Sequence, residues 1–152
     1  PELFPLPENY HDLLKKSMKE KCKRCNTVPH EPALCLLCGT LVCAGNDCCK
    51  NESEQGECTQ HVITCGCGAA PFLFLKQCLL VMIRVGGGCR FSTPYLDAYG
   101  EEDPGLKRGR PLHLSCERYA RLLQLWAGHR LHAEIARSPG SRGTHDIAWD
   151  GL

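Results

Sequence analysis

Cysteine is the feature that most restricts how this chain can fold, because 13 of its 152 residues are cysteines. Ten of them lie between residues 22 and 67, and the other three are Cys78, Cys89 and Cys116. Such clustering is typical either of a disulfide framework in a secreted protein or of metal sites in a reducing compartment. The spacing of the cysteines separates these two alternatives.

Two cysteine pairs have the spacing of zinc knuckles. Two residues separate Cys22 from Cys25 and Cys35 from Cys38, and Gly39 follows the second pair. A tight turn at this spacing directs backbone N–H groups at the sulfurs and lets two thiolates face one cation. Cysteines this close rarely bond to each other in structural disulfides, because the short ring is strained. The pairs therefore favour zinc.

A histidine stands within the series of cysteines, in the string Cys58-Thr-Gln-His61-Val-Ile-Thr-Cys65. Histidine has no role in a disulfide scheme, but it is an ordinary zinc ligand. The odd number of cysteines also argues against complete pairing. We therefore interpret the cluster as structural zinc in a reducing compartment, and we expect the cytoplasm, with the nucleus as a second location.

Ten residues are candidate zinc ligands: Cys22, Cys25, Cys35, Cys38, Cys43, Cys48, Cys49, Cys58, His61 and Cys65. Two tetrahedral sites need eight ligands and three need twelve, so two sites are expected. A third would require Cys67, His30 or a thiolate that bridges two ions. One expected site contains Cys35, Cys38, Cys58 and His61. The other joins Cys22 and Cys25 to two residues from the set Cys43, Cys48, Cys49 and Cys65.

We expect one α+β domain over residues 1–152, in which a small zinc-stapled module is joined to a short antiparallel sheet with one long C-terminal helix packed on it. Residues 1–21 form a proline-rich lead and a helix of about three turns that ends near Lys21. Residues 22–68 form the zinc-binding module. Residues 69–152 contain the strands, an acidic and then basic loop that pairs with itself or with a neighbouring domain, and the long helix.

The aromatic and β-branched positions after residue 71 predict strands at 72–76 and 78–84, arranged as a hairpin. The glycines at 86–88 predict a turn before a further strand at 89–92. Residues 111–114 predict another short strand. Apolar residues at helical spacing then predict the long helix over 117–136, loosened midway by Gly128: Tyr119, Leu122, Leu123, Trp126, Leu131 and Ile135. The tail is expected to dock through Ile147, Trp149 and Leu152.

Charge and hydrophobicity exclude several classes of partner. The formal net charge is only +1, so the chain lacks the excess of Lys and Arg that neutralises nucleic-acid phosphates. Its longest apolar run is far shorter than the roughly 18 residues of a membrane span, which excludes a membrane partner. The chain begins without Met and without a signal-peptide pattern, so we expect it to be part of a larger protein. Surplus cysteine ligands favour closed zinc sites, and no catalytic residue is predicted.

Several unusual strings resemble one known domain. They are Pro32-Ala-Leu-Cys-Leu-Leu-Cys-Gly39, Cys58-x2-His61-x3-Cys65, Pro94-Tyr-Leu-Asp-Ala-Tyr-Gly-Glu-Glu-Asp103 and Gly105-Leu-Lys-Arg-Gly-Arg-Pro-Leu112. In this order they resemble the C-terminal domain of UBR-family E3 ubiquitin ligases, the N-recognins of the N-degron pathway. The resemblance covers about residues 5–152.

The resemblance implies a non-catalytic zinc-binding scaffold with a regulatory, autoinhibitory role in a ligase that ubiquitinates substrates for degradation. In that family a UBR box captures substrate, and a RING region upstream promotes ubiquitin transfer. The implied partners are therefore the UBR box and RING region of the same chain and, through the parent protein, an E2 enzyme and ubiquitin.

Two other functions stay open. One is a minimal RING-like domain that recruits an E2 enzyme, which the long series of ligands favours. The compressed spacing after Cys38 and the missing central C-x-H core speak against it. The other is a zinc-stapled peptide-binding module, with the acidic loop from Asp97 to Asp103 as its contact surface.

Overall fold

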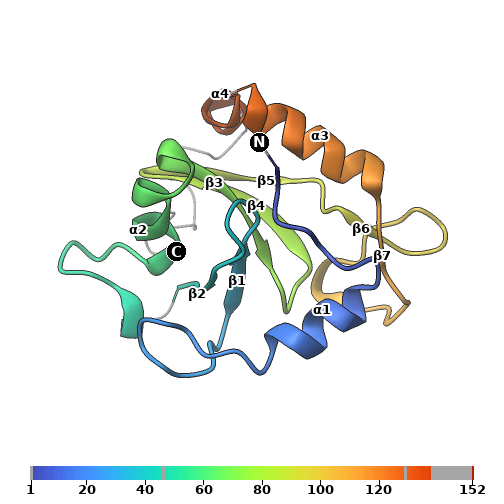
Figure 1. The fold of residues 1–152 in the computed structure, drawn as a ribbon, viewed down its shortest axis with the longest axis horizontal. Coiled ribbons are helices and arrows are strands. Elements are labelled where there is room, and N and C mark those ends of the chain that lie inside the picture. The colour runs from blue at the N-terminus through green and yellow to red at the C-terminus, as the bar shows by residue number, and fades with distance from the viewer. Residues whose placement is uncertain (1, 46, 129, 138–151) are drawn as a thin grey trace.

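The computed structural model describes residues 2–45, 47–128, 130–137 and 152. Its centre is a five-stranded antiparallel sheet with the strand order β2-β1-β3-β4-β5 (Figure 1). These strands are β1 (Pro32–Cys35), β2 (Leu41–Cys43), β3 (Ala69–Phe74), β4 (Leu79–Arg84) and β5 (Gly87–Phe91). A second sheet pairs β6 (Tyr95–Leu96) with β7 (His113–Leu114).

In the described residues, four α-helices pack around the sheet: α1 (Tyr10–Ser17), α2 (Glu57–Thr64), α3 (Cys116–Ala127) and α4 (Leu131–Arg137). In Figure 1, α2 lies at the left of the sheet, while α1 and α3 lie at the right. The α+β class predicted from the sequence is confirmed. Among the described residues, no helix combines the length and the apolar character needed to cross a bilayer.

Both faces of the central sheet are buried, and alternate residues of each strand enter different cores. Along β4, Leu80 and Met82 join the core that contains α1, α3 and α4, whereas Val81 and Ile83 join the core that contains α2. A strand buried on both faces has no polar side to alternate with its apolar one. This explains the nearly continuous apolar run in the sequence.

The predicted hairpin is present, with its boundaries shifted. Strand β3 begins at Ala69 rather than at residue 72, because Ala69 already pairs with Arg84. The glycine-rich turn is shorter than expected, since Gly87 pairs with Arg84 and Gly88 with Ile83 as part of β5. Only residues 85 and 86 remain in the turn, where Gly86 has a φ of +80°.

Both helices predicted outside the cysteine-rich segment are longer in the prediction than in the structure. Helix α1 ends at Ser17, because the chain beyond it turns into the first cysteine knuckle. The single helix predicted over 117–136 is wrong: the structure has α3 and α4, separated at Gly128, whose backbone is not helical. A Cβ atom at Gly128 would lie 3.1 Å from the carbonyl oxygen of Gln124, so this close turn favours glycine.

Residues 22–68 are more regular than the sequence predicted. They contribute β1, β2 and α2, and β1 pairs with β3, so the central sheet takes strands from both sides of the expected segment boundary. Of the expected tail, Leu152 packs against the α2 core, and its carbonyl oxygen accepts a hydrogen bond of 2.9 Å from the backbone N–H of Cys58. Ile147 and Trp149 lie outside the described residues.

The acidic and then basic loop pairs with itself. The side chain of Asp97 is only 1% exposed and lies 3.3 Å from the guanidinium of Arg110. Arg108 contacts Glu101 at 2.6 Å and Asp103 at 3.8 Å. Buried carboxylates need such partners, so these contacts fix the path of the loop.

Replacing Asp97 with Asn is expected to lower the midpoint of thermal unfolding at pH 7. The midpoint should also fall less between pH 7 and pH 2 than it does in the wild type. Hydrogen bonds from the backbone N–H groups of Glu101 and Tyr99, together with Arg110, hold the pKa of Asp97 below its ordinary value. The resulting stability is present above the unfolded-state pKa of about 3.9 and is lost as the pH falls through the lower folded-state pKa. Thermal scans between pH 2 and pH 7 measure this, with the exposed Glu20→Gln as the control. Identical acid profiles for wild type and Asp97→Asn would contradict it.

Candidate metal centre

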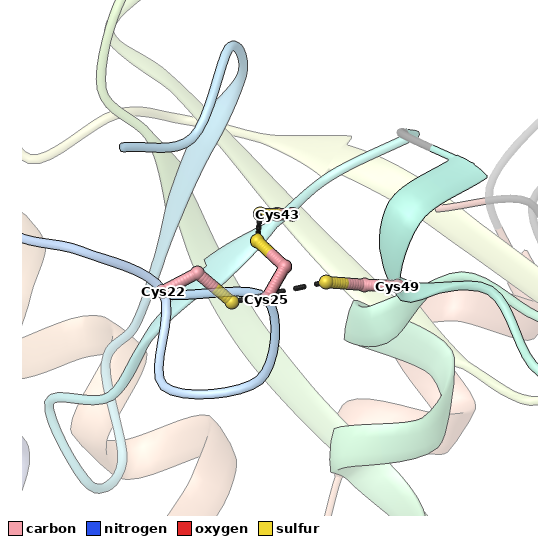
Figure 2. Close-up of side chains that lie close together, drawn as sticks. All are labelled: Cys22, Cys25, Cys43 and Cys49. Carbon is pink, nitrogen blue, oxygen red and sulfur yellow. Dashed lines mark hydrogen bonds between the residues drawn. The ribbon is translucent and has the colours of Figure 1, made fainter. Parts of the chain in front are cut away.

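Four cysteines from three segments meet beside the edge strand β2. We call Cys22, Cys25, Cys43 and Cys49 the four-cysteine group. Their sulfurs converge on a common centre (Figure 2). The Sγ atoms of Cys22 and Cys49 are 3.8 Å apart, as are those of Cys25 and Cys43. Only Cys25 is partly exposed, and the other three are buried.

The first knuckle is formed by a local turn. The backbone N–H of Cys22 donates to the carbonyl of Thr27, and that of Asn26 donates to the carbonyl of Cys22. The backbone N–H of Arg24 points at the Sγ of Cys22, 3.4 Å away. This is the arrangement expected from the two-residue spacing, in which backbone donors stabilise a thiolate.

A second set of ligands lies where β1 ends and α2 passes over it. We call Cys35, Cys38, His61 and Cys65 the cysteine–histidine group. The Sγ atoms of Cys35 and Cys65 are 3.9 Å apart, and the Nε2 of His61 lies 3.3 Å from the Sγ of Cys38. The His61 ring also meets the Phe72 ring edge to face, at a centroid distance of 5.9 Å.

The knuckle of the second group requires its glycine. Gly39 has a φ of +79°, and its backbone N–H closes the turn on the carbonyl of Cys35. A Cβ atom at this position would lie 2.3 Å from the Phe4 ring. The turn that orients the thiols of Cys35 and Cys38 therefore packs directly against Phe4 in the N-terminal segment.

Both groups have the dimensions of a tetrahedral metal site. Sulfur ligands about 2.3 Å from a tetrahedral zinc ion lie about 3.8 Å from one another. The sulfur separations in the structure are 3.8 Å and 3.9 Å, and all ligand atoms within each group lie within 4.8 Å of one another. Each group can thus hold one metal ion with four side-chain ligands. Sets of four thiolates, or of three thiolates and an imidazole, are compatible with zinc.

Eight of the ten predicted ligands are brought together, and Cys48 and Cys58 are not among them. Cys65 takes the position beside Cys35, Cys38 and His61 that the sequence analysis gave to Cys58. The described part of the chain contains two such groups and no third one.

The structure places Cys58 in the core beneath α2 and outside both ligand groups. It lies in the first turn of α2 and is fully buried, on the face that also carries Val62. Burial raises the pKa of its thiol. Cys48, in contrast, is exposed, although its Sγ lies 3.7 Å from that of Cys49.

The ligands differ in how readily they lose a proton. Hydrogen bonds with the side chain and backbone of Thr27 lower the pKa of Cys25 to about 6. Burial lowers the pKa of His61, which favours the neutral imidazole that binds metals. Burial raises the pKa values of Cys43 and Cys49. A metal ion must therefore displace protons from buried thiols, which makes its affinity increase with pH.

Substitution of Cys65 by Ser is expected to remove one of two bound ions, whereas Cys58→Ala is expected to keep both. The reason is that Cys65 faces the cysteine–histidine group and Cys58 faces the core. Metal content per chain, measured by inductively coupled plasma mass spectrometry, checks this, with the exposed Cys48→Ser as a second control. Loss of an ion from Cys58→Ala, with both retained in Cys65→Ser, would reverse the assignment.

Comparison with known proteins links this chain to ubiquitin ligases. The family described as Proteolysis_6 C-terminal matches residues 1–128. The chain is 45% identical over 141 residues to the E3 ubiquitin-protein ligase UBR1 of Mus musculus and 43% identical over 129 residues to UBR3 of Homo sapiens. It is 40% identical over 157 residues to UBR2 of Mus musculus. These alignments cover 90%, 85% and 99% of the chain but only 8%, 7% and 9% of the relatives.

Proposed function

Because the chain belongs to the C-terminal Proteolysis_6 family of UBR-type E3 ubiquitin ligases, we propose that it is a zinc-binding, non-catalytic domain of such a ligase. The chain spans less than a tenth of the length of the curated relatives that it matches. Its role lies within a much larger protein, to whose ubiquitination and degradation activity it contributes as a scaffold and as an autoinhibitory contact. The partners of this contact are the UBR box and the RING region of the same chain.

The observation that carries the proposal is that each group offers four protein ligands at tetrahedral spacing. A catalytic zinc site keeps one coordination position open for water or substrate, whereas a structural site is closed. Zinc bound here would supply cross-links between segments and no reactive centre. The knuckle at residues 22–25, the strands β1 and β2 and helix α2 would then be fixed to one another by two ions.

Residues 1–152 act together in this proposal as one domain. The central sheet takes β1 and β2 from the cysteine-rich segment and β3, β4 and β5 from the segment after it. The two metal groups lie on the part of the fold that contains β1, β2 and α2.

The order of the ligands favours a second candidate, a RING-like domain that recruits an E2 enzyme. The first and third ligand pairs along the chain form the four-cysteine group, and the second and fourth form the cysteine–histidine group. This interleaving is the cross-brace arrangement of RING domains. The compressed spacing and the missing C-x-H core still distinguish the chain from an ordinary RING.

Two measurements test the proposed function. X-ray absorption at the zinc edge should give the average of one site with four sulfur ligands and one with three sulfurs and one nitrogen, about 3.5 sulfurs and 0.5 nitrogen per ion. The isolated chain, added to a UBR-type ligase that lacks this domain, should reduce substrate ubiquitination. Ubiquitin chains made by the isolated chain with an E2 enzyme would favour the RING-like candidate instead, and absence of zinc would reject both.

A further inference from the structure

Helix α2 contacts both metal groups. Its second turn carries His61 and leads into Cys65, which are two of the four ligands of the cysteine–histidine group. Its first turn carries Glu57 and Gln60, which contact the segments of the four-cysteine group although neither is a ligand. The same eight-residue helix therefore lies against both sites.

Glu57 holds the β2 ligand of the four-cysteine group in place. Its Oε1 accepts a hydrogen bond of 2.8 Å from the backbone N–H of Cys43 and one of 3.1 Å from the thiol of Cys22. A bound ion would displace the thiol proton and with it the second bond. The bond from the backbone N–H of Cys43 does not use that proton.

Gln60 joins the two other segments of the same group. Its Nε2 donates to the carbonyl of Cys49 at 2.8 Å and to the carbonyl of Gln55 at 2.7 Å. Its Oε1 accepts a hydrogen bond from the guanidinium of Arg24, which lies between the knuckle ligands Cys22 and Cys25. One amide side chain thus connects the knuckle, the turn at Cys49 and α2.

The interleaved ligand order adds an entropic link between the groups. Fixing Cys35 and Cys38 against His61 and Cys65 closes a loop that contains Cys43 and Cys49. The cost of bringing distant residues together increases with the length of free chain between them. An ion in the cysteine–histidine group therefore reduces the cost of assembling the four-cysteine group, and the reverse also holds.

We propose that α2 couples the two metal groups, so that an ion in one raises the affinity of the other, with Glu57 and Gln60 as the positioning residues. This inference rests on the proposed function, because it requires both groups to bind zinc. Coupling of this kind is reciprocal, and couplings between protein sites are typically about 5-fold or more in affinity.

Zinc extraction from the 152-residue chain by a chromophoric chelator tests the coupling. From the wild type, both ions should leave in one transition that is steeper than that of a single independent site. Gln60→Ala and Glu57→Ala keep all eight ligands, and from these variants the ions should leave no more steeply than from independent sites. Glu57→Gln keeps an acceptor for the Cys43 N–H and should restore the steep transition. Ile63→Ala changes an exposed residue of the same helix, 58% exposed, and should behave as wild type.

A second arm measures the coupling directly. Cys65→Ser disables the cysteine–histidine group, and the zinc affinity of the four-cysteine group should then fall by at least about 5-fold. In a Gln60→Ala background the same change should have a smaller effect. If Cys65→Ser fails to fold, the variants that keep all eight ligands still decide the question.

Each outcome separates the coupling from the proposed function. A wild type that holds two ions, releases them no more steeply than independent sites and shows the same release curve in Gln60→Ala would overturn the coupling and leave the proposed function standing. A wild type that binds no zinc would overturn both.

Discussion

Chelation of the metal is expected to unfold the chain, including strands that hold no ligand. Structural zinc sites contribute on the order of 10 kcal/mol each to folding. A domain of this size has a total stability of about 5–15 kcal/mol, so loss of either ion removes most of it. Circular dichroism before and after treatment with a chelator measures the effect, and addition of zinc should restore the signal.

The unfolding should extend beyond the cysteine-rich segment because β1 lies inside the sheet. It pairs with β2 on one side and with β3 on the other, where Ala33 faces Phe74. Hydrogen exchange should therefore show lost protection in β3 as well as in β1. A metal-free chain that keeps its full ellipticity and its thermal midpoint would contradict the structural role of zinc.

Replacement of Phe72 by Ala is expected to have the largest effect of any single core substitution that spares the ligands. Phe72 is fully buried between the sheet and α2, and its ring contacts that of His61. Truncation of a buried Phe costs about 3–5 kcal/mol, through lost burial and the cavity left behind. The expected result is a shift of the urea midpoint to much lower concentration, together with weaker metal binding by the cysteine–histidine group.

Two variants provide the controls for Phe72→Ala. Phe72→Leu keeps most of the volume and should cost less than about 1.5 kcal/mol. Tyr99→Ala removes an aromatic ring that is 76% exposed and stacks only on the guanidinium of Arg110, so it should change stability by no more than about 1 kcal/mol. Equal effects of Phe72→Ala and Tyr99→Ala would show that the α2 core contributes little to stability.

Most of the metal centre could be predicted from sequence because its ligands follow local rules. The knuckles at Cys22 and Cys35 are turns of four residues, and their geometry is fixed by nearby backbone bonds. The fourth ligand of the second group could not be found in this way. Both Cys58 and Cys65 stand at plausible spacing from His61, and only the packing of α2 on the sheet decides between them.

The secondary structure was likewise predictable where local sequence determines it, and not where it depends on contacts between distant segments. The hairpin of β3 and β4 was predictable from its apolar residues, and the acidic loop from its own charges. The strands β1 and β2 are only four and three residues long, and β1, which carries β2 at the sheet edge, pairs with a strand more than thirty residues away. Such short segments carry little signal of their own, because tertiary contacts decide their conformation.

The ligand order also has a consequence for the growing chain on the ribosome. The last ligand of the four-cysteine group is residue 49 and the last of the cysteine–histidine group is residue 65, whereas β3 begins at residue 69. Both sets of ligands therefore emerge before the strands that will bury them. Zinc bound at these groups would therefore fix β1 and β2 before β3 and β4 are made, and a chain made without zinc would expose β3 and β4, its most apolar strands, without an ordered β1 to pair with.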